Sequence, residues 1–109
     1  DGLFARRPKG ELTVWKVVRL EAGRSAPQRP TDMIFVGDQL YFVSSTKKDP
    51  GGALWRITEN EAAPKLIQAF SGFSPEGLAY DDSRNEFMVT FDAGKQGSRF
   101  LVVKGPKDN

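Results

Sequence analysis

The chain of 109 residues contains neither cysteine nor histidine. The absence of cysteine excludes disulfides and thiolate metal sites. The absence of histidine excludes a Ser-His-Asp triad, histidine-ligated zinc and proton transfer through imidazole. No complete catalytic constellation is left in the sequence, so the residues alone do not decide whether the protein is an enzyme.

Long apolar runs and a strong charge of one sign are also missing. The apolar runs are far shorter than a membrane span requires, and the net charge is only +2. Residues 1–30 carry seven Lys or Arg against three acids, whereas the rest of the chain carries nine against eleven. This basic leader lacks the interleaved aromatic residues of a single-strand binding platform and is typical of a solvated surface. We therefore predict neither a nucleic-acid nor a membrane partner.

What the sequence does contain is an internal repeat with a spacing of about 45 residues. Asp32–Ile57 matches Glu76–Val103 in its acidic start, its apolar alternation and its glycine-marked turns. Apolar residues make up 39% of the chain and charged residues 28%, which is an ordinary globular balance. A repeat of this length is typical of β-propeller blades.

The short runs of β-branched and aromatic residues between turns predict strands rather than helices. We predict an all-β fold of antiparallel four-stranded blade-like sheets, a partial β-propeller with about two and a half blades. We expect residues 1–30 to form a basic leader with a hairpin from a partial blade and a connector. Residues 31–73 form one repeat, 74–104 a second and incomplete one, and 105–109 a tail. An internal duplication within a small β-sandwich or barrel is the alternative.

A closed propeller of four blades needs roughly 160 residues at about 40 per blade, more than this chain has. We therefore expect a piece of a larger ring, or a subunit that completes its ring by oligomerising. Exposed sheet faces and edges are unfavourable in water, so the expected partners are further blades of a parent protein or copies of the chain itself. The side chains predicted to pack between blades are Trp15, Trp55, Phe35, Phe42, Phe87 and Phe100.

The segment Ser74–Asp81 (SPEGLAYD), followed by Asn85–Asp92 (NEFMVTFD), resembles a pattern of calcium-associated six-bladed propellers. The phytase-like esterases and the gluconolactonase/senescence-marker group share this pattern. In those families an acidic residue at the start of the innermost strand faces the central channel, where it serves a metal or a polar ligand. The resemblance implies this role for Glu76, and we assign Asp32 to the same place in the preceding repeat. It also implies an extracytoplasmic location, which the residues themselves do not determine.

Two functions follow as hypotheses. In the first, the chain is a structural and binding module that docks with further blades. In the second, it is part of a divalent-metal-dependent hydrolase of the phytase-like or lactonase-like kind, with Glu76 near the central channel. Two neighbouring carboxylates at Glu76 and Asp32 would repel each other unless a hard cation or a basic group neutralised them, and their oxygen ligands suit Ca²⁺ or Mg²⁺. Alternatively, each carboxylate accepts hydrogen bonds from backbone N–H groups at a strand start, or pairs with an arginine.

Overall fold

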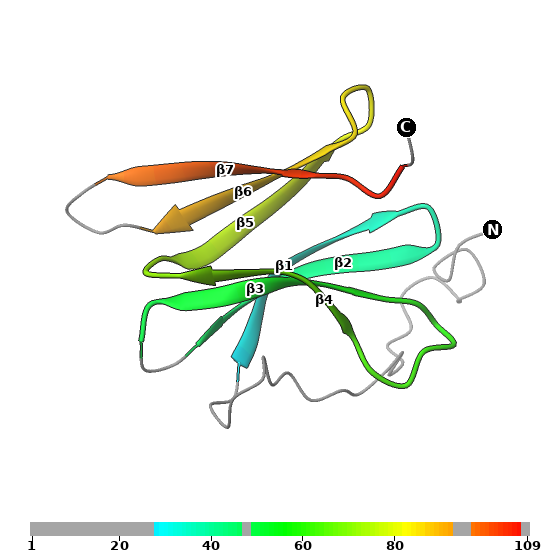
Figure 1. Cartoon of the computed structure of the whole chain (residues 1–109), viewed down its shortest axis with the longest axis horizontal. Coiled ribbons are helices and arrows are strands. Elements are labelled where there is room, and N and C mark those ends of the chain that lie inside the picture. The colour runs from blue at the N-terminus through cyan, green and yellow to red at the C-terminus, as the bar shows by residue number, and fades with distance from the viewer. Residues whose placement is uncertain (1–27, 47–48, 93–96, 108–109) are drawn as a thin grey trace, which may run out of the picture.

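The computed structural model describes residues 28–46, 49–92 and 97–107, and every strand below lies in these ranges. Two antiparallel sheets are formed, and no helix occurs in the described ranges (Figure 1). Sheet A has the strand order β1-β2-β3-β4 and sheet B the order β5-β6-β7. The strands are β1 (Gln28–Val36), β2 (Gln39–Thr46), β3 (Gly51–Ile57), β4 (Lys65–Ser71), β5 (Ser74–Asp81), β6 (Glu86–Asp92) and β7 (Ser98–Lys104).

The predicted all-β class and the antiparallel pairing are confirmed. Each sheet is a meander, in which strands that follow one another in the chain are also neighbours in the sheet. The first repeat supplies four strands and the second repeat three, as the sequence pattern predicts. The first strand starts earlier than predicted, at Gln28, because the end of the expected connector pairs with β2. The rest of the leader, residues 1–27, lies outside the described residues.

The first hairpin of each sheet turns in a different way. In sheet A the turn consists of Gly37 and Asp38, and Gly37 has a φ of 63°, which glycine adopts without a steric cost. In sheet B the turn spans residues 82–85 and ends at Asn85 with a φ of 54°. Asparagine tolerates this left-handed conformation better than most residues. The second repeat is therefore two residues longer than the first at this point.

The first strand of each sheet, β1 or β5, contains a β-bulge near its start. In β1 the register skips Thr31, directly after Pro30, and in β5 it skips Glu76, directly after Pro75. A bulge adds one unpaired residue and increases the local twist of its strand. The two bulges, each preceded by proline, lie at equivalent positions in the strand registers of the two repeats.

This register corrects the predicted correspondence between the repeats by one residue. The bulges equate Glu76 with Thr31, and they equate Asp32 with Gly77. The sequence comparison paired Glu76 with Asp32 because both are acidic. The two positions also differ in the room they offer: a Cβ atom at Gly77 would lie 2.4 Å from the Thr90 hydroxyl, whereas position 32 carries a full side chain.

The main core lies between the two sheets. Its buried aromatic pair is Tyr41 of sheet A and Phe87 of sheet B, whose ring centroids are 4.6 Å apart. Burial of such large side chains is the principal favourable term in folding. The buried members are Tyr41, Val43 and Leu54 from sheet A, and Leu78, Phe87, Val89 and Phe91 from sheet B.

A second cluster is buried on the other face of sheet A. Trp55 is 4% exposed there, and its indole Nε1 donates a hydrogen bond of 2.8 Å to the hydroxyl of Ser44. The remaining members are Leu40, Phe42, Ala53 and Ile57, with Phe35 packed against them. The middle strands β2 and β3 of sheet A are thus buried on both faces, whereas much of β1 and β4 is exposed.

The aromatic residues predicted to pack between sheets divide into three groups. Trp55, Phe42 and Phe87 are buried and Phe35 is half-buried, in agreement with the prediction. Phe100 is 67% exposed, because it lies on the face of sheet B that points away from sheet A. Trp15 lies outside the described residues.

Candidate functional site

The face of sheet B that points away from sheet A carries exposed apolar side chains. Strand pairing places Ala79, Met88 and Val102 in one row across the three strands. Gly77, Thr90 and Phe100 form the next row. We call these six residues the outer face. Met88 is 40%, Val102 51% and Phe100 67% exposed, which is unusual for large apolar side chains so close together.

The outer face of sheet B corresponds to a buried face of sheet A. Counting from the hairpin turns, Met88 occupies the position of Tyr41, and Thr90 that of Val43. Across the next pair of strands, Phe100 occupies the position of Leu54. Tyr41, Val43 and Leu54 all pack against sheet B.

The edge strands β1 and β5 are joined by side-chain hydrogen bonds. The Oδ2 atom of Asp32 accepts a hydrogen bond of 2.8 Å from the backbone N–H of Leu78. Its Oδ1 atom accepts one of 2.8 Å from the N–H of Met33. The hydroxyl of Thr31 donates a hydrogen bond of 3.0 Å to the carbonyl oxygen of Pro75. Both oxygens of the Asp32 carboxylate therefore bond backbone N–H groups, the second of the two roles considered from the sequence.

Glu76 is exposed at the β5 bulge. Among the described residues no group of three or more Asp, Glu, His or Cys side chains could hold a metal ion. The described residues thus supply at most two carboxylates near this strand start, fewer ligands than Ca²⁺ takes. A role of Glu76 and Asp32 in metal binding stays a prediction.

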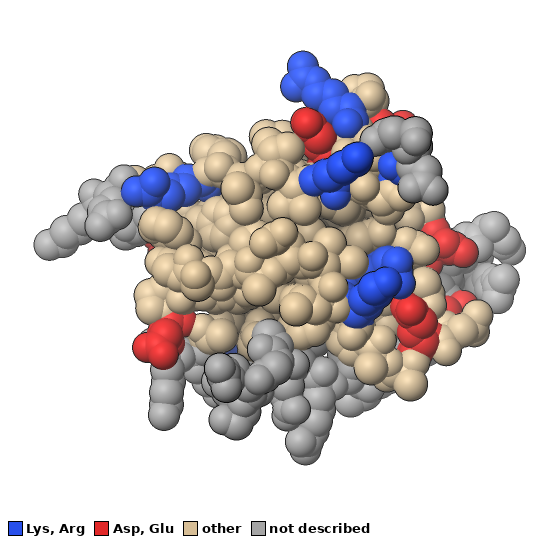
Figure 2. All heavy atoms as spheres, viewed as in Figure 1, with Lys and Arg blue, Asp and Glu red and all other residues tan. Residues whose placement is uncertain are grey.

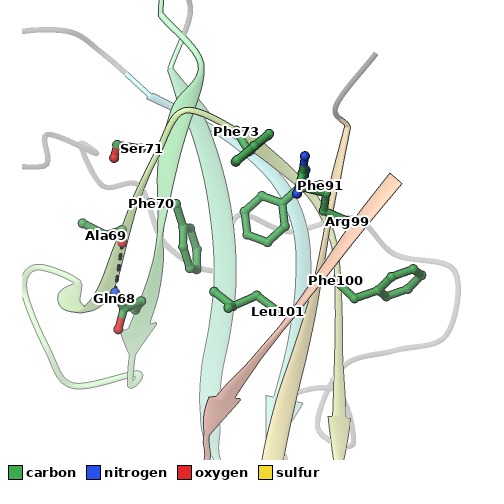
Figure 3. A pocket seen from close by; sticks show the side chains of 9 residues that line it. All are labelled: Gln68, Ala69, Phe70, Ser71, Phe73, Phe91, Arg99, Phe100 and Leu101. Carbon is green, nitrogen blue, oxygen red and sulfur yellow. Dashed lines mark hydrogen bonds between the residues drawn. The ribbon is translucent and has the colours of Figure 1, made fainter. Parts of the chain in front are cut away.

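A groove of about 320 Å³ lies between the edge strands β4 and β7 (Figure 3). The rings of Phe70 and Phe91 meet edge to face in it, with centroids 5.0 Å apart. The Arg99 guanidinium lies 4.7 Å from the centre of the Phe73 ring, a cation–π contact. Leu101 lines the groove as well, whereas Phe100 points away from Phe70 (Figure 3). Sequence reasoning missed this groove, because its lining comes from two repeats.

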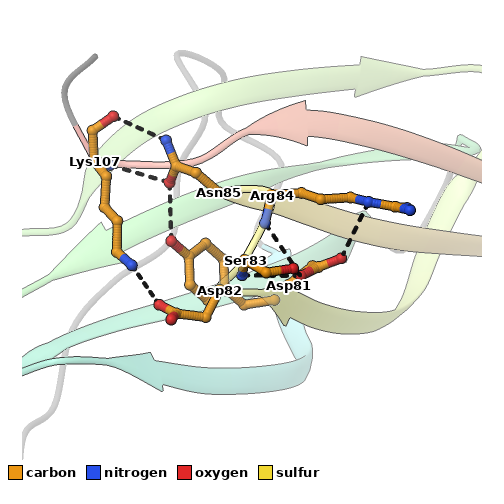
Figure 4. A network of polar contacts seen from close by, with 7 residues as sticks. Asp81, Asp82, Ser83, Arg84, Asn85 and Lys107 are labelled. Atoms are coloured by element: carbon orange, nitrogen blue, oxygen red, sulfur yellow. Dashed lines mark hydrogen bonds and ion pairs between the residues drawn. The ribbon is translucent and has the colours of Figure 1, made fainter.

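The acidic turn between β5 and β6 is a local hydrogen-bonded structure rather than a ligand loop (Figure 4). Asp81 Oδ1 accepts hydrogen bonds from the Ser83 hydroxyl (2.8 Å) and N–H (3.1 Å), and from the Arg84 N–H (3.3 Å). These bonds, led by that of the Ser83 hydroxyl, hold the pKa of Asp81 below its usual value. The Asn85 side chain then bonds the Tyr80 hydroxyl and the backbone of Lys107. The turn thereby fastens the end of the described chain to sheet B.

Comparison with known proteins finds no matching family model, no matching curated protein and no matching solved structure. The resemblance to calcium-associated propellers therefore rests on the residues quoted for it. In the described ranges, no helix has the length and apolar character needed to cross a membrane. The outer face, the groove and the β1–β5 junction are the features from which a function has to be argued.

Proposed function

We propose that this chain is a structural and binding module built from propeller-type blades, whose function is to dock with a further β-sheet. The docking surface is the outer face of sheet B. The observation that supports this most strongly is that the exposed Met88 and Phe100 and the half-buried Thr90 correspond to the buried Tyr41, Leu54 and Val43 of sheet A.

The same correspondence defines the chemistry of the partner. The face of sheet A that corresponds to the outer face is covered by sheet B. The covering side of sheet B carries Leu78, Phe87 and Val89. A partner for the outer face would therefore be an antiparallel sheet that presents a similar row of large apolar side chains. Such a contact removes apolar surface from water, which is favourable by a free energy of roughly 25 cal/mol for each Å² buried.

The charge distribution agrees with an apolar contact. Figure 2 looks towards the edge strands β7 and β4 of Figure 1, and a broad area without Lys, Arg, Asp or Glu crosses its middle, over the groove between these strands and beside the outer face. Charged residues are depleted at the centres of protein interfaces. The six residues of the outer face are uncharged, and the next row on the same side of the sheet is charged, with Asp81, Glu86 and Lys104.

In a solution of the chain alone, the sheet available to the outer face is the outer face of a second copy. We expect the mass measured by light scattering to rise with concentration from 12.1 kDa towards twice that value. The double variant Met88→Lys/Val102→Lys should stay at 12.1 kDa, because it places two charges in the contact. Met33→Lys, a control at a 58% exposed position of sheet A, should behave like the unmodified chain.

A folded, unmodified chain that keeps the monomer mass at all concentrations would contradict the proposal. Equal association of the double variant and the unmodified chain would also contradict it, because the contact would then lie elsewhere. The metal-dependent hydrolase hypothesis stays a separate prediction, tested through Glu76 as described in the Discussion.

A further inference from the structure

We propose that the edge of β7 accepts an extended peptide strand, which adds a fourth strand to sheet B and places an apolar side chain in the groove between β4 and β7. The inference rests on the proposed function, since it assumes that sheet B follows the plan of sheet A. It concerns a different surface, however: the edge of the sheet rather than its outer face.

The two sheets differ at this edge. In sheet A, β3 pairs with β2 on one side and with β4 on the other. In sheet B, β7 holds the position of β3, and of the described residues only β6 pairs with it. A strand edge presents a row of backbone N–H and C=O groups that can pair with another extended chain.

The groove continues the core beyond β7. Phe70 and Phe91 belong to the apolar side chains of the inter-sheet core or pack against it, and both line the groove. Leu101 borders the groove from β7 and is 41% exposed. Figure 3 shows Leu101 on the same side as Phe70, so a side chain of an added strand beside Leu101 would enter between them.

Sheet A indicates what kind of strand fits. Leu101 holds the position of Trp55, which pairs with Leu66 of β4. Phe100 holds the position of Leu54, which pairs with Gln68. The occupant should therefore be an antiparallel strand with an apolar residue beside Leu101 and a polar residue beside Phe100. The sequence of β4, KLIQAFS, has this pattern.

The probe for the test is a synthetic peptide of residues 64–72 (PKLIQAFSG), titrated into the full chain labelled with ¹⁵N. We expect saturable binding, with the largest amide shifts in β7. Leu101→Asp should weaken binding about tenfold or more, because an interface leucine next to an aromatic groove is replaced by a charge. The milder Leu101→Ala keeps the fold at this partly exposed position and should weaken binding several-fold.

The matched control is Val102→Lys, the neighbouring residue on the opposite face of the same strand, which should leave peptide binding unchanged. Two further peptides carry proline at the positions of Gln68 and Ala69. Successive N–H groups of a strand point to opposite sides, so one of these two peptides should lose binding and the other should largely retain it.

The inference is overturned by the absence of saturable binding, by equal binding of the two Leu101 variants and the unmodified chain, or by shifts centred on β3, which would mean that the peptide replaces β4. These outcomes are separate from those of the mass measurement. The Met88→Lys/Val102→Lys variant abolishes self-association if the outer face docks, and it still binds the peptide. Leu101→Asp has the opposite pattern.

Discussion

Sheets A and B are built from the same repeat but differ in what covers them. Sheet A has a buried cluster on each face, one around Tyr41 and one around Trp55. Sheet B contributes only to the cluster around Tyr41, and its outer face exposes Met88, Phe100 and Val102. The same kind of apolar alternation therefore produces a core side chain in one repeat and a surface side chain in the other.

The difference indicates that the apolar pattern of the second repeat is not satisfied by sheet A alone. A residue such as Phe100 adds little to the stability of this chain while it is in contact with water. In the contact proposed above, a further sheet would remove this apolar surface from water. The predictions below test this contrast between the two sheets, starting with the largest effect.

Truncation of buried aromatics should cost the most. We expect Phe87→Ala and Trp55→Ala each to lower the free energy of unfolding by about 3–5 kcal/mol, through lost burial and a residual cavity. Phe100→Ala should change it by less than about 0.5 kcal/mol at concentrations where the chain is monomeric. Urea denaturation measures all three. A large loss of unfolding free energy in Phe100→Ala would show that this ring is already covered. The two sheets would then not differ in burial as described.

The turn of sheet B should be the next most sensitive place. Asn85→Ala removes the side-chain bonds to Tyr80 and Lys107, and at a φ of 54° it replaces asparagine with a residue that tolerates this conformation less well. We expect a loss of about 1–3 kcal/mol. Asn85→Gly, the control, keeps the conformation accessible and should lose less. If both variants unfold at the same urea concentration, the left-handed conformation at position 85 does not contribute to the loss of stability in Asn85→Ala.

Variants at the junction between β1 and β5 distinguish the two roles considered for its carboxylates. Asp32→Ala should lower stability by about 1–2 kcal/mol with or without Ca²⁺, because it removes the bond to the Leu78 N–H. Glu76→Gln should have little effect on the melting temperature. If Ca²⁺ instead raises the melting temperature of the unmodified chain and not that of Glu76→Gln, the metal hypothesis is supported.

The smallest effect concerns pH. The native pKa of Asp81 is lowered, chiefly by the hydrogen bond from the Ser83 hydroxyl. Its contribution to stability is therefore fully present above the pKa of an unfolded aspartate, about 3.9. It is lost as the pH falls through the lower native pKa. The urea midpoint should fall slightly less between pH 5 and pH 3 in Asp81→Asn than in the unmodified chain. An identical decrease in both would contradict this assignment.

The repeat in the sequence predicted the strand class, the antiparallel pairing and the change from four strands to three. It did not predict the register of β1 and β5, because the acidic residues at positions 32 and 76 suggested that these two positions are equivalent. The bulges at Thr31 and Glu76 determine that register. The prolines at 30 and 75, each directly before its bulge, are the signal in the sequence that could have revealed it.

The exposure of Phe100 could not be predicted for a different reason. Alternation along β7 separates the residues of its two faces, but it does not say which face another sheet covers. The groove around Phe70 and Arg99 likewise depends on how the two sheets pack. Such features arise from contacts between repeats, and a pattern within one repeat carries no information about them.

The most direct test of the docking function is a dilution series followed by the methyl signals of the labelled chain. If the outer face is the docking surface, the methyl signals of Met88 and Val102 shift with concentration, whereas those of the core residues Val89 and Leu54 stay constant. Unchanged Met88 and Val102 signals across the series, or shifts confined to sheet A, would contradict the account.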